Sequence, residues 1–155
     1  TAVSFYPEDV TYRMESTNLG AGVIQREHRY ASLIRRVMEV IEARKPGIVC
    51  IEGYALGAKG SAASGLIEYG WQLRLKLLDA NYRVVEVPPM SLKKFICGGA
   101  GGKADKLAVC VQITKKWGKE FATNDEYDAY GLARIAACLA GYDEPTNEHQ
   151  RAVLA

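Results

Sequence analysis

The chain has 155 residues, of which 48% are hydrophobic and 25% are charged, and its formal net charge is +2. This length suits a single domain with one core, and the composition is ordinary for a soluble globular protein. No apolar run approaches the roughly 20 residues of a membrane span, and no signal peptide is evident. A nucleic-acid-binding protein with so small a net charge would need its basic residues gathered on one face.

The cysteines lie far apart in the sequence and form no C-x-x-C pair. Their spacing matches neither a zinc cluster nor the disulfide framework of a small secreted protein. We therefore expect an intracellular protein. The four residues are Cys50, Cys97, Cys110 and Cys138.

The first third of the chain predicts two short strands, at residues 2–6 and 10–17, on either side of a turn at Pro7. Apolar residues then recur at helical spacing from Tyr30 to Ile41, with most arginines off that stripe. This pattern predicts an amphipathic helix with a solvated basic face. Pro46-Gly47 ends it.

Residues 48–52 predict a buried strand because they are apolar and β-branched up to the final Glu52. At the carboxyl end of a strand this carboxylate can point into a ligand-binding crevice, or it can simply face water. The next stretch, residues 54–64, is rich in Gly, Ala and Ser. It is either a flexible loop or a loop that lets a bulky polymer approach the backbone.

The second half of the chain predicts one more strand and several helices. We expect a helix through about Ala80 with Leu66 inward, a strand at 83–87, and a short helical turn capped by Ser91. A glycine cluster at residues 98–102 follows. Further helices are expected at about 105–117, with Leu107, Cys110 and Thr114 inward, from about 124 to 140, and after Pro145.

The helix that starts near Asn124 carries two aspartates. Thr123 and Glu126 form a capping-box pattern, and Asp125 and Asp128 are three residues apart, hence on one face. Acidic residues are favoured in the first turn of any helix. Asp128, however, lies past that turn and beside the apolar stripe, where a carboxylate needs a positive partner.

Three carboxylates, Glu52, Asp125 and Asp128, could together bind a hard divalent cation through oxygen ligands. Mg²⁺ held in this way can activate water and stabilise phosphoryl oxygens during phosphodiester hydrolysis. Lysines near the glycine-rich segments would add phosphate contacts. The residues alone make this chemistry plausible without fixing it.

Four motifs in order resemble RuvC-type Holliday-junction resolvases, in particular phage-encoded members, within the ribonuclease H-like superfamily. The likeness spans nearly the whole chain. The motifs are Ile51-Glu52-Gly53-Tyr54-Ala55-x-Gly57-Ala58-Lys59-Gly60, Val87-Pro88-Pro89-x-x-Leu92-Lys93-Lys94-Phe95, Ala104-Asp105-Lys106 and Asn124-Asp125-x-x-Asp128-Ala129-Tyr130.

This resemblance implies an α/β fold with a ribonuclease H-like mixed sheet flanked by helices on both faces. It implies that Glu52, Asp125 and Asp128 are the metal ligands and catalytic carboxylates, with two Mg²⁺ ions for which Mn²⁺ can substitute. Lys106 would act at the scissile phosphate. Further DNA contacts are expected from Lys93, Lys94, Lys103 and Lys59. The implied assembly is a homodimer in the bacterial cytoplasm, or in the host cytoplasm if phage-encoded.

The sequence departs from the family pattern at its start. The family's first strand carries an aspartate just ahead of a segment like Thr1–Phe5, whereas Asp9 sits in a turn and does not match. Either this sequence is trimmed ahead of Thr1, so that a further strand with this aspartate precedes it, or the chain lacks this ligand. We expect residues 1–155 to form a single ribonuclease H-like nuclease domain, with the first strand missing before Thr1.

The resulting hypothesis is a structure-selective endonuclease that makes paired nicks in four-way or other branched DNA by two-metal hydrolysis. One alternative is another ribonuclease H-like nuclease that acts on flaps or RNA–DNA hybrids. A second alternative is a catalytically impaired module that only binds branched DNA.

Overall fold

The computed structural model describes residues 1–16, 22–54, 61–99 and 104–155. Within these ranges the chain forms four short strands and six helices. Their order is β1 (Ala2–Phe5), β2 (Val10–Arg13), α1 (Val23–Arg44), β3 (Val49–Glu52), α2 (Ser61–Asp79), β4 (Val84–Val87), α3 (Pro89–Cys97), α4 (Lys106–Trp117), α5 (Asn124–Leu139) and α6 (Glu148–Leu154). In this described part no helix is long and apolar enough to cross a membrane.

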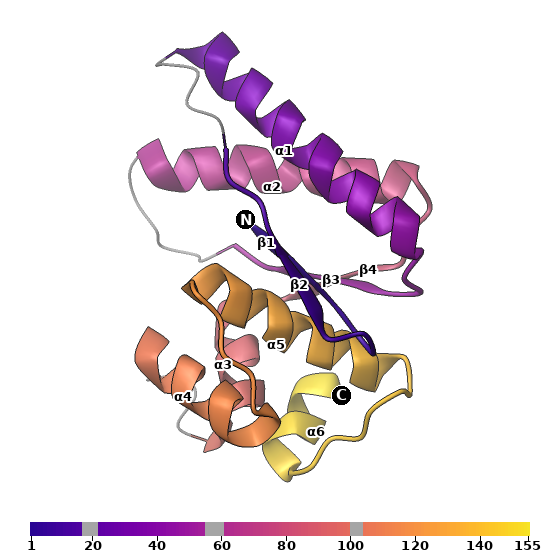
Figure 1. Ribbon diagram of the computed structural model, residues 1–155, viewed down its shortest axis with the longest axis vertical. Coiled ribbons are helices and arrows are strands. Elements are labelled where there is room, and N and C mark those ends of the chain that lie inside the picture. Colours follow the sequence, from indigo (N-terminus) through magenta and orange to yellow (C-terminus); the bar gives the residue numbers. More distant parts are fainter. Residues whose placement is uncertain (17–21, 55–60, 100–103) are drawn as a thin grey trace.

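The strands lie between two layers of helices (Figure 1). Helices α1 and α2 cover one side, while α5 packs on the other side with α3, α4 and α6 beyond it. Two hydrophobic cores follow from this arrangement. One includes Ile34, Val37 and Leu77 from α1 and α2, and the other includes Phe95, Ile113 and Tyr130 from α3, α4 and α5. The predicted α/β class with helices on both faces is confirmed.

The strands pair in two separate sets. β1 and β2 form an antiparallel hairpin in which Ala2 lies opposite Arg13, and β3 and β4 pair in parallel with Glu52 opposite Val87. Both pairing directions of a mixed sheet are therefore present. Among the described residues, however, they form two two-stranded sheets and not one continuous sheet.

Three local predictions were wrong. Leu107 is 71% exposed, because α4 buries Val109 and Ile113 instead. Leu66 also faces outward from α2. α3 begins earlier than expected, with Pro88 as its N-cap residue, so Ser91 lies inside the helix. Pro89 takes the first helical position. Proline suits this position because a backbone N–H there would have no partner within the helix, and proline has none.

The start of α5 was predicted correctly. Thr123 and Glu126 form the expected capping box, with the Thr123 backbone nitrogen donating to Glu126 Oε2 at 2.9 Å. Such a cap satisfies backbone N–H groups that the first helical turn leaves without partners. This fixes the position of the helix that carries Asp125 and Asp128.

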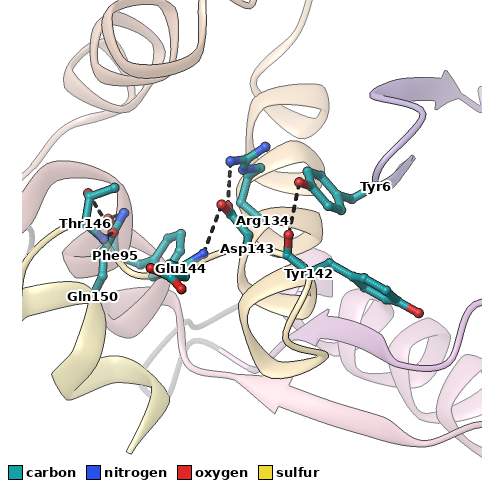
Figure 2. A network of polar contacts seen from close by, with 8 residues as sticks. All are labelled: Tyr6, Phe95, Arg134, Tyr142, Asp143, Glu144, Thr146 and Gln150. Carbon is teal, nitrogen blue, oxygen red and sulfur yellow. Dashed lines mark hydrogen bonds and ion pairs between the residues drawn. The ribbon is translucent and has the colours of Figure 1, made fainter.

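Polar contacts hold the C-terminal segment against α5 and α3 (Figure 2). Arg134 on α5 pairs with Asp143 at 2.5 Å, and its guanidinium also lies over the ring of Tyr6. The buried Gln150 side chain on α6 donates to the Phe95 carbonyl at 3.3 Å. These contacts explain how a short C-terminal helix stays packed on α3.

Candidate metal-binding nuclease site

A large cavity of about 790 Å³ lies between β1 and β3. All residues of both strands line it, together with parts of α1, α2 and α5. Its lining is mostly apolar, but Glu52, Asp125, Asp128 and Lys106 belong to it. The structure therefore brings all three predicted carboxylates and one predicted lysine to a common space.

β1 and β3 run in opposite directions along this cavity. The Thr1 nitrogen, just before β1, lies 3.2 Å from Asp125 Oδ2, close to the carboxyl end of β3. Phe5, at the other end of β1, lies under the guanidinium of Arg44, which comes shortly before β3 in the chain. The carboxylates are therefore gathered at one end of the cavity.

Glu52 is the last residue of β3. The strand forms because Val49, Cys50 and Ile51 pack on the two cores, and its ladder ends where the Gly53 nitrogen donates to the Val87 carbonyl at 2.8 Å. The Glu52 side chain is exposed, whereas the residues before it are half-buried. A carboxylate at the strand end can thus reach the crevice without being buried in the core.

Asp125 and Asp128 lie in the first turns of α5, but their surroundings differ. The Asp125 side chain is 66% exposed and its Oδ2 atom is the one next to Thr1. Asp128 is half-buried between the buried residues Tyr127 and Ala129. The sequence correctly indicated that Asp128 lies beside the apolar stripe.

The acids at this end of the cavity affect one another. Glu52 is exposed as a residue, but the protein around its carboxylate displaces part of the water and so raises its pKa. The charges of Asp128 and Asp125 raise this pKa further, while Lys93 and Lys106 lower it. Burial likewise raises the pKa of Asp128, with Asp125 adding to the shift and the same two lysines opposing it. Repulsion between these carboxylates therefore contributes to the raised pKa values, although loss of water is the larger cause.

The predicted basic residues divide into three groups. Lys106 is exposed at the start of α4 and lies near Glu52 and Asp128. Lys93 is near them too, and its Nζ donates to the Ala104 carbonyl at 2.9 Å, which ties α3 to the segment before α4. Lys94 is half-buried and is not among the charges that shift either pKa. Lys59 and Lys103 lie outside the described residues.

The carboxylates suit a hard cation in their chemistry. Oxygen donors are what Mg²⁺ and Mn²⁺ prefer, and three carboxylates at one end of a cavity leave negative charge that a cation would offset. Yet in residues 1–16, 22–54, 61–99 and 104–155 no three acidic, histidine or cysteine side chains are grouped closely enough to hold a metal ion.

One contact at this end of the cavity was not predicted from the sequence. Arg74 on α2 donates to the backbone carbonyl of Glu52 at 2.9 Å. Its position on the helix carries no motif, so only the three-dimensional arrangement could reveal it. Asp9, by contrast, pairs with Lys119 at 3.2 Å and takes no part in the site, as the sequence indicated.

Comparison with known proteins gives the fold a name. No protein-family profile matches the sequence, and no curated protein matches it either. Among solved structures, Thermus thermophilus RuvC is similar, with a TM-score of 0.61 and 19% identity over 85% of this chain and 78% of that one. The chain has the RuvC fold.

A second RuvC structure supports the same assignment. T. thermophilus RuvC in complex with a Holliday junction substrate matches with a TM-score of 0.64 and 15% identity, over 88% of this chain and 81% of that one. The predicted ribonuclease H-like class is confirmed. The expectation of a further strand with an aspartate before Thr1, and the roles of the individual site residues, stay predictions.

Proposed function

We propose that the protein is a structure-selective DNA endonuclease that cleaves four-way junctions or other branched DNA. One observation carries this proposal: Glu52, Asp125 and Asp128 line one end of a cavity, with Lys93 and Lys106 close by, in a chain that has the RuvC fold. Carboxylates flanked by lysines suit a site that binds cations and phosphate together.

The carboxylates and the lysines of the site would have different roles. Glu52, Asp125 and Asp128 would hold two Mg²⁺ ions, or Mn²⁺ in their place, and bound metal supplies an activated water and neutralises charge on the phosphate. Lys106, exposed at the start of α4, would contact the phosphate undergoing attack. Lys93 and Lys94 would hold the neighbouring DNA backbone, with Lys59 and Lys103 expected to contribute further contacts.

The proposed assembly is a homodimer that places two sites for paired nicks across a junction. α2 presents a suitable surface, since a row of large apolar side chains on one face of this helix is exposed. At helical spacing these residues lie within about 80° of one another. They are Ile67, Trp71, Leu75 and Leu78. Exposed apolar surface of this kind often marks a protein interface.

A specific observation favours the alternative of a module that binds branched DNA without cutting it. In the described ranges, no three potential ligands are grouped to hold an ion. Cleavage would then require the three carboxylates to come closer together when metal binds. A nuclease acting on flaps or RNA–DNA hybrids would use the same site, so only the substrate separates it from a resolvase.

The deciding experiment compares cleavage of four substrates by the full chain in Mg²⁺ and in Mn²⁺. The substrates are a four-way junction, a flap, an RNA–DNA hybrid and a linear duplex of matched sequence. We expect paired nicks in the junction and little cutting of the duplex. Asp128→Asn should reduce cleavage by roughly a hundredfold or more, while it keeps or improves junction binding in EDTA.

The outcomes separate the hypotheses. Preferred cutting of flaps or hybrids would replace the resolvase by a related nuclease. Tight, junction-selective binding without nicking would support the binding module. Nicking by Asp128→Asn at the parent rate would show that Asp128 is not a metal ligand.

A further inference from the structure

A single side chain on α2 connects the carboxyl end of β3 to both α2 and β4. Arg74 donates to the Glu52 carbonyl at 2.9 Å, to the Tyr54 hydroxyl at 3.0 Å and to the Gly70 carbonyl at 3.0 Å. It also pairs with Glu86 Oε2 on β4, with both Nε and Nη2 at 2.9 Å. Its guanidinium lies 4.4 Å from the centre of the Tyr54 ring.

These contacts use the particular shape of arginine. The Arg74 side chain is only 11% exposed, so its charge and its N–H groups need partners inside the protein. The planar guanidinium offers donors in several fixed directions, which here meet acceptors from a helix and from two strands. A lysine ammonium could not reach all of these acceptors and stack on Tyr54 at the same time.

Two glycines make room for this arrangement. A Cβ atom at Gly70 would lie 2.8 Å from Arg74 Nη1 and 3.1 Å from the Tyr54 ring. A Cβ atom at Gly53 would lie 3.0 Å from Glu86 Oε1. The close approach of Arg74, Tyr54 and Glu86 to the backbone therefore depends on the absence of a side chain at both positions.

The Arg74 contact lies where the strand ladder stops. Backbone pairing with β4 ends at the Gly53 nitrogen, which donates to the Val87 carbonyl. The Glu52 carbonyl faces Arg74 on α2. The peptide plane between Glu52 and Gly53 is thus held on one side by β4 and on the other by α2.

We propose that Arg74 is a positioning residue that sets the direction of the Glu52 carboxylate by fixing the peptide that follows it. This inference rests on the proposed function, because Glu52 is a metal ligand only under that hypothesis. Glu86 has the supporting role of balancing the arginine charge. Loss of Arg74 should leave Glu52 at the end of β3 but change the direction in which its carboxylate points.

The test compares two substitutions that break different parts of the arrangement. Arg74→Lys keeps the charge but loses the set of hydrogen bonds, whereas Glu86→Gln removes the charge pair and leaves Arg74 bonded to the Glu52 carbonyl. Mn²⁺ binding is measured by electron paramagnetic resonance, and amide hydrogen exchange is followed at Gly53. Arg26→Lys is the matched control, since Arg26 pairs with Glu68 at 3.0 Å between α1 and α2.

We expect Arg74→Lys to weaken Mn²⁺ binding by roughly tenfold or more, as for other residues that orient a metal ligand. It should also speed exchange at Gly53, while Glu86→Gln and Arg26→Lys change either measurement by no more than about twofold. Equal effects of Arg74→Lys and Glu86→Gln, or no effect of Arg74→Lys, would overturn the proposal.

The design separates failure of this inference from failure of the proposed function. If the parent chain binds no Mn²⁺ and cuts no DNA, the metal-dependent nuclease is wrong. Exchange at Gly53 then decides alone whether Arg74 fixes the strand end. If the parent binds Mn²⁺ and Arg74→Lys binds it equally well, the function stands and the positioning role of Arg74 does not.

Discussion

Glu52, at the end of β3, and Asp128, in the second turn of α5, line the same cavity, and the negative charge of Asp128 disfavours ionisation of Glu52. Burial is the first cause that raises the pKa of Glu52, and the charge of Asp128 is the second. Lys93 and Lys106 oppose the shift in both acids. Without a bound cation, the fold therefore keeps two acids together at a cost in stability.

The first prediction concerns pH and Asp128. Its folded-state pKa is raised above the ordinary value of 3.8. An acid whose pKa is higher in the folded state favours folding only while it is protonated. The contribution of Asp128 to stability is therefore fully present below pH 3.8 and is lost as the pH rises through its folded-state pKa. In EDTA at pH 7, Asp128→Asn should raise the melting temperature by roughly 1–3 °C, given about 2–4 °C per kcal/mol for this size. At pH 3 the difference should vanish. A difference that does not change with pH would contradict this reading.

The second prediction separates the two kinds of lysine. Lys106→Ala should lower the single-turnover cleavage rate by roughly 10²–10³-fold with little change in junction affinity, as for a contact made mainly in the transition state. Lys94→Ala should instead weaken binding and reduce the salt dependence of the binding constant by about one unit of slope. If Lys106→Ala lowers affinity and leaves the rate unchanged, Lys106 only tethers the DNA.

The sequence predicted the strands and helices, and the places of the three carboxylates on them, because these signals are local. The β-branched run before Glu52 and the capping box at Thr123 each depend on a few neighbouring residues. The pairing of the strands was less predictable. β1 and β3 are more than forty residues apart in the chain and face each other across the cavity. No local pattern in the sequence records how two such distant strands are placed.

Helix faces were harder to assign where the apolar residues outnumber the buried positions. α4 has apolar residues on several sides, so the spacing suggested that Leu107 faces inward, whereas Val109 and Ile113 are the buried residues. Cys110, also predicted to face inward, is partly buried against this core. Arg74 was not predicted for a different reason. Its partners come from three elements, and no pattern along one helix records such a contact.

The third prediction concerns the contact between α5 and α3. A Cβ atom at Gly131 would lie 2.6 Å from Ile96 Cδ1 and 3.0 Å from Leu92 Cδ1, in the buried core. Gly131→Ala should therefore destabilise the fold by about 1–3 kcal/mol through overpacking. Gly47→Ala is the control, because a Cβ there meets nothing within 4 Å. Urea unfolding of both variants measures the effect, and equal midpoints would show that α3 moves aside freely.

The fourth prediction concerns assembly through α2. Trp71 is 59% exposed in the middle of the apolar row that also contains Ile67, Leu75 and Leu78. If this row is the dimer interface, Trp71→Glu should raise the dimer dissociation constant at least about tenfold, as for a central aromatic contact. Light scattering after size exclusion measures the mass. Leu107→Glu, an exposed site on α4, is the control and should leave the mass unchanged. A parent chain that is monomeric at high micromolar concentration would contradict the proposed homodimer.

The fifth prediction concerns the open edges of β1 and β3. Each strand pairs on one side only among the described residues, and both line the cavity along their full length. Unpaired edges of this kind can accept a further strand. Because β1 and β3 run in opposite directions, a strand between them would be antiparallel to β1 and parallel to β3. A segment joined ahead of Thr1 by a tight turn would have that direction, and its last residue would lie near Asp125.

This can be tested by extending the chain with about five residues of alternating Val and Ile that end in Asp, followed by a two-residue turn. We expect the extension to raise the melting temperature by about 5 °C or more, because it would pair two strand edges and fill apolar space. The same extension ending in Asn should stabilise equally but bind Mn²⁺ more weakly. If a Gly-Ser extension of equal length stabilises as much, the cavity does not bind a strand. Equal Mn²⁺ affinity of the Asp and Asn forms would show that this end of the cavity lies too far from the metal site.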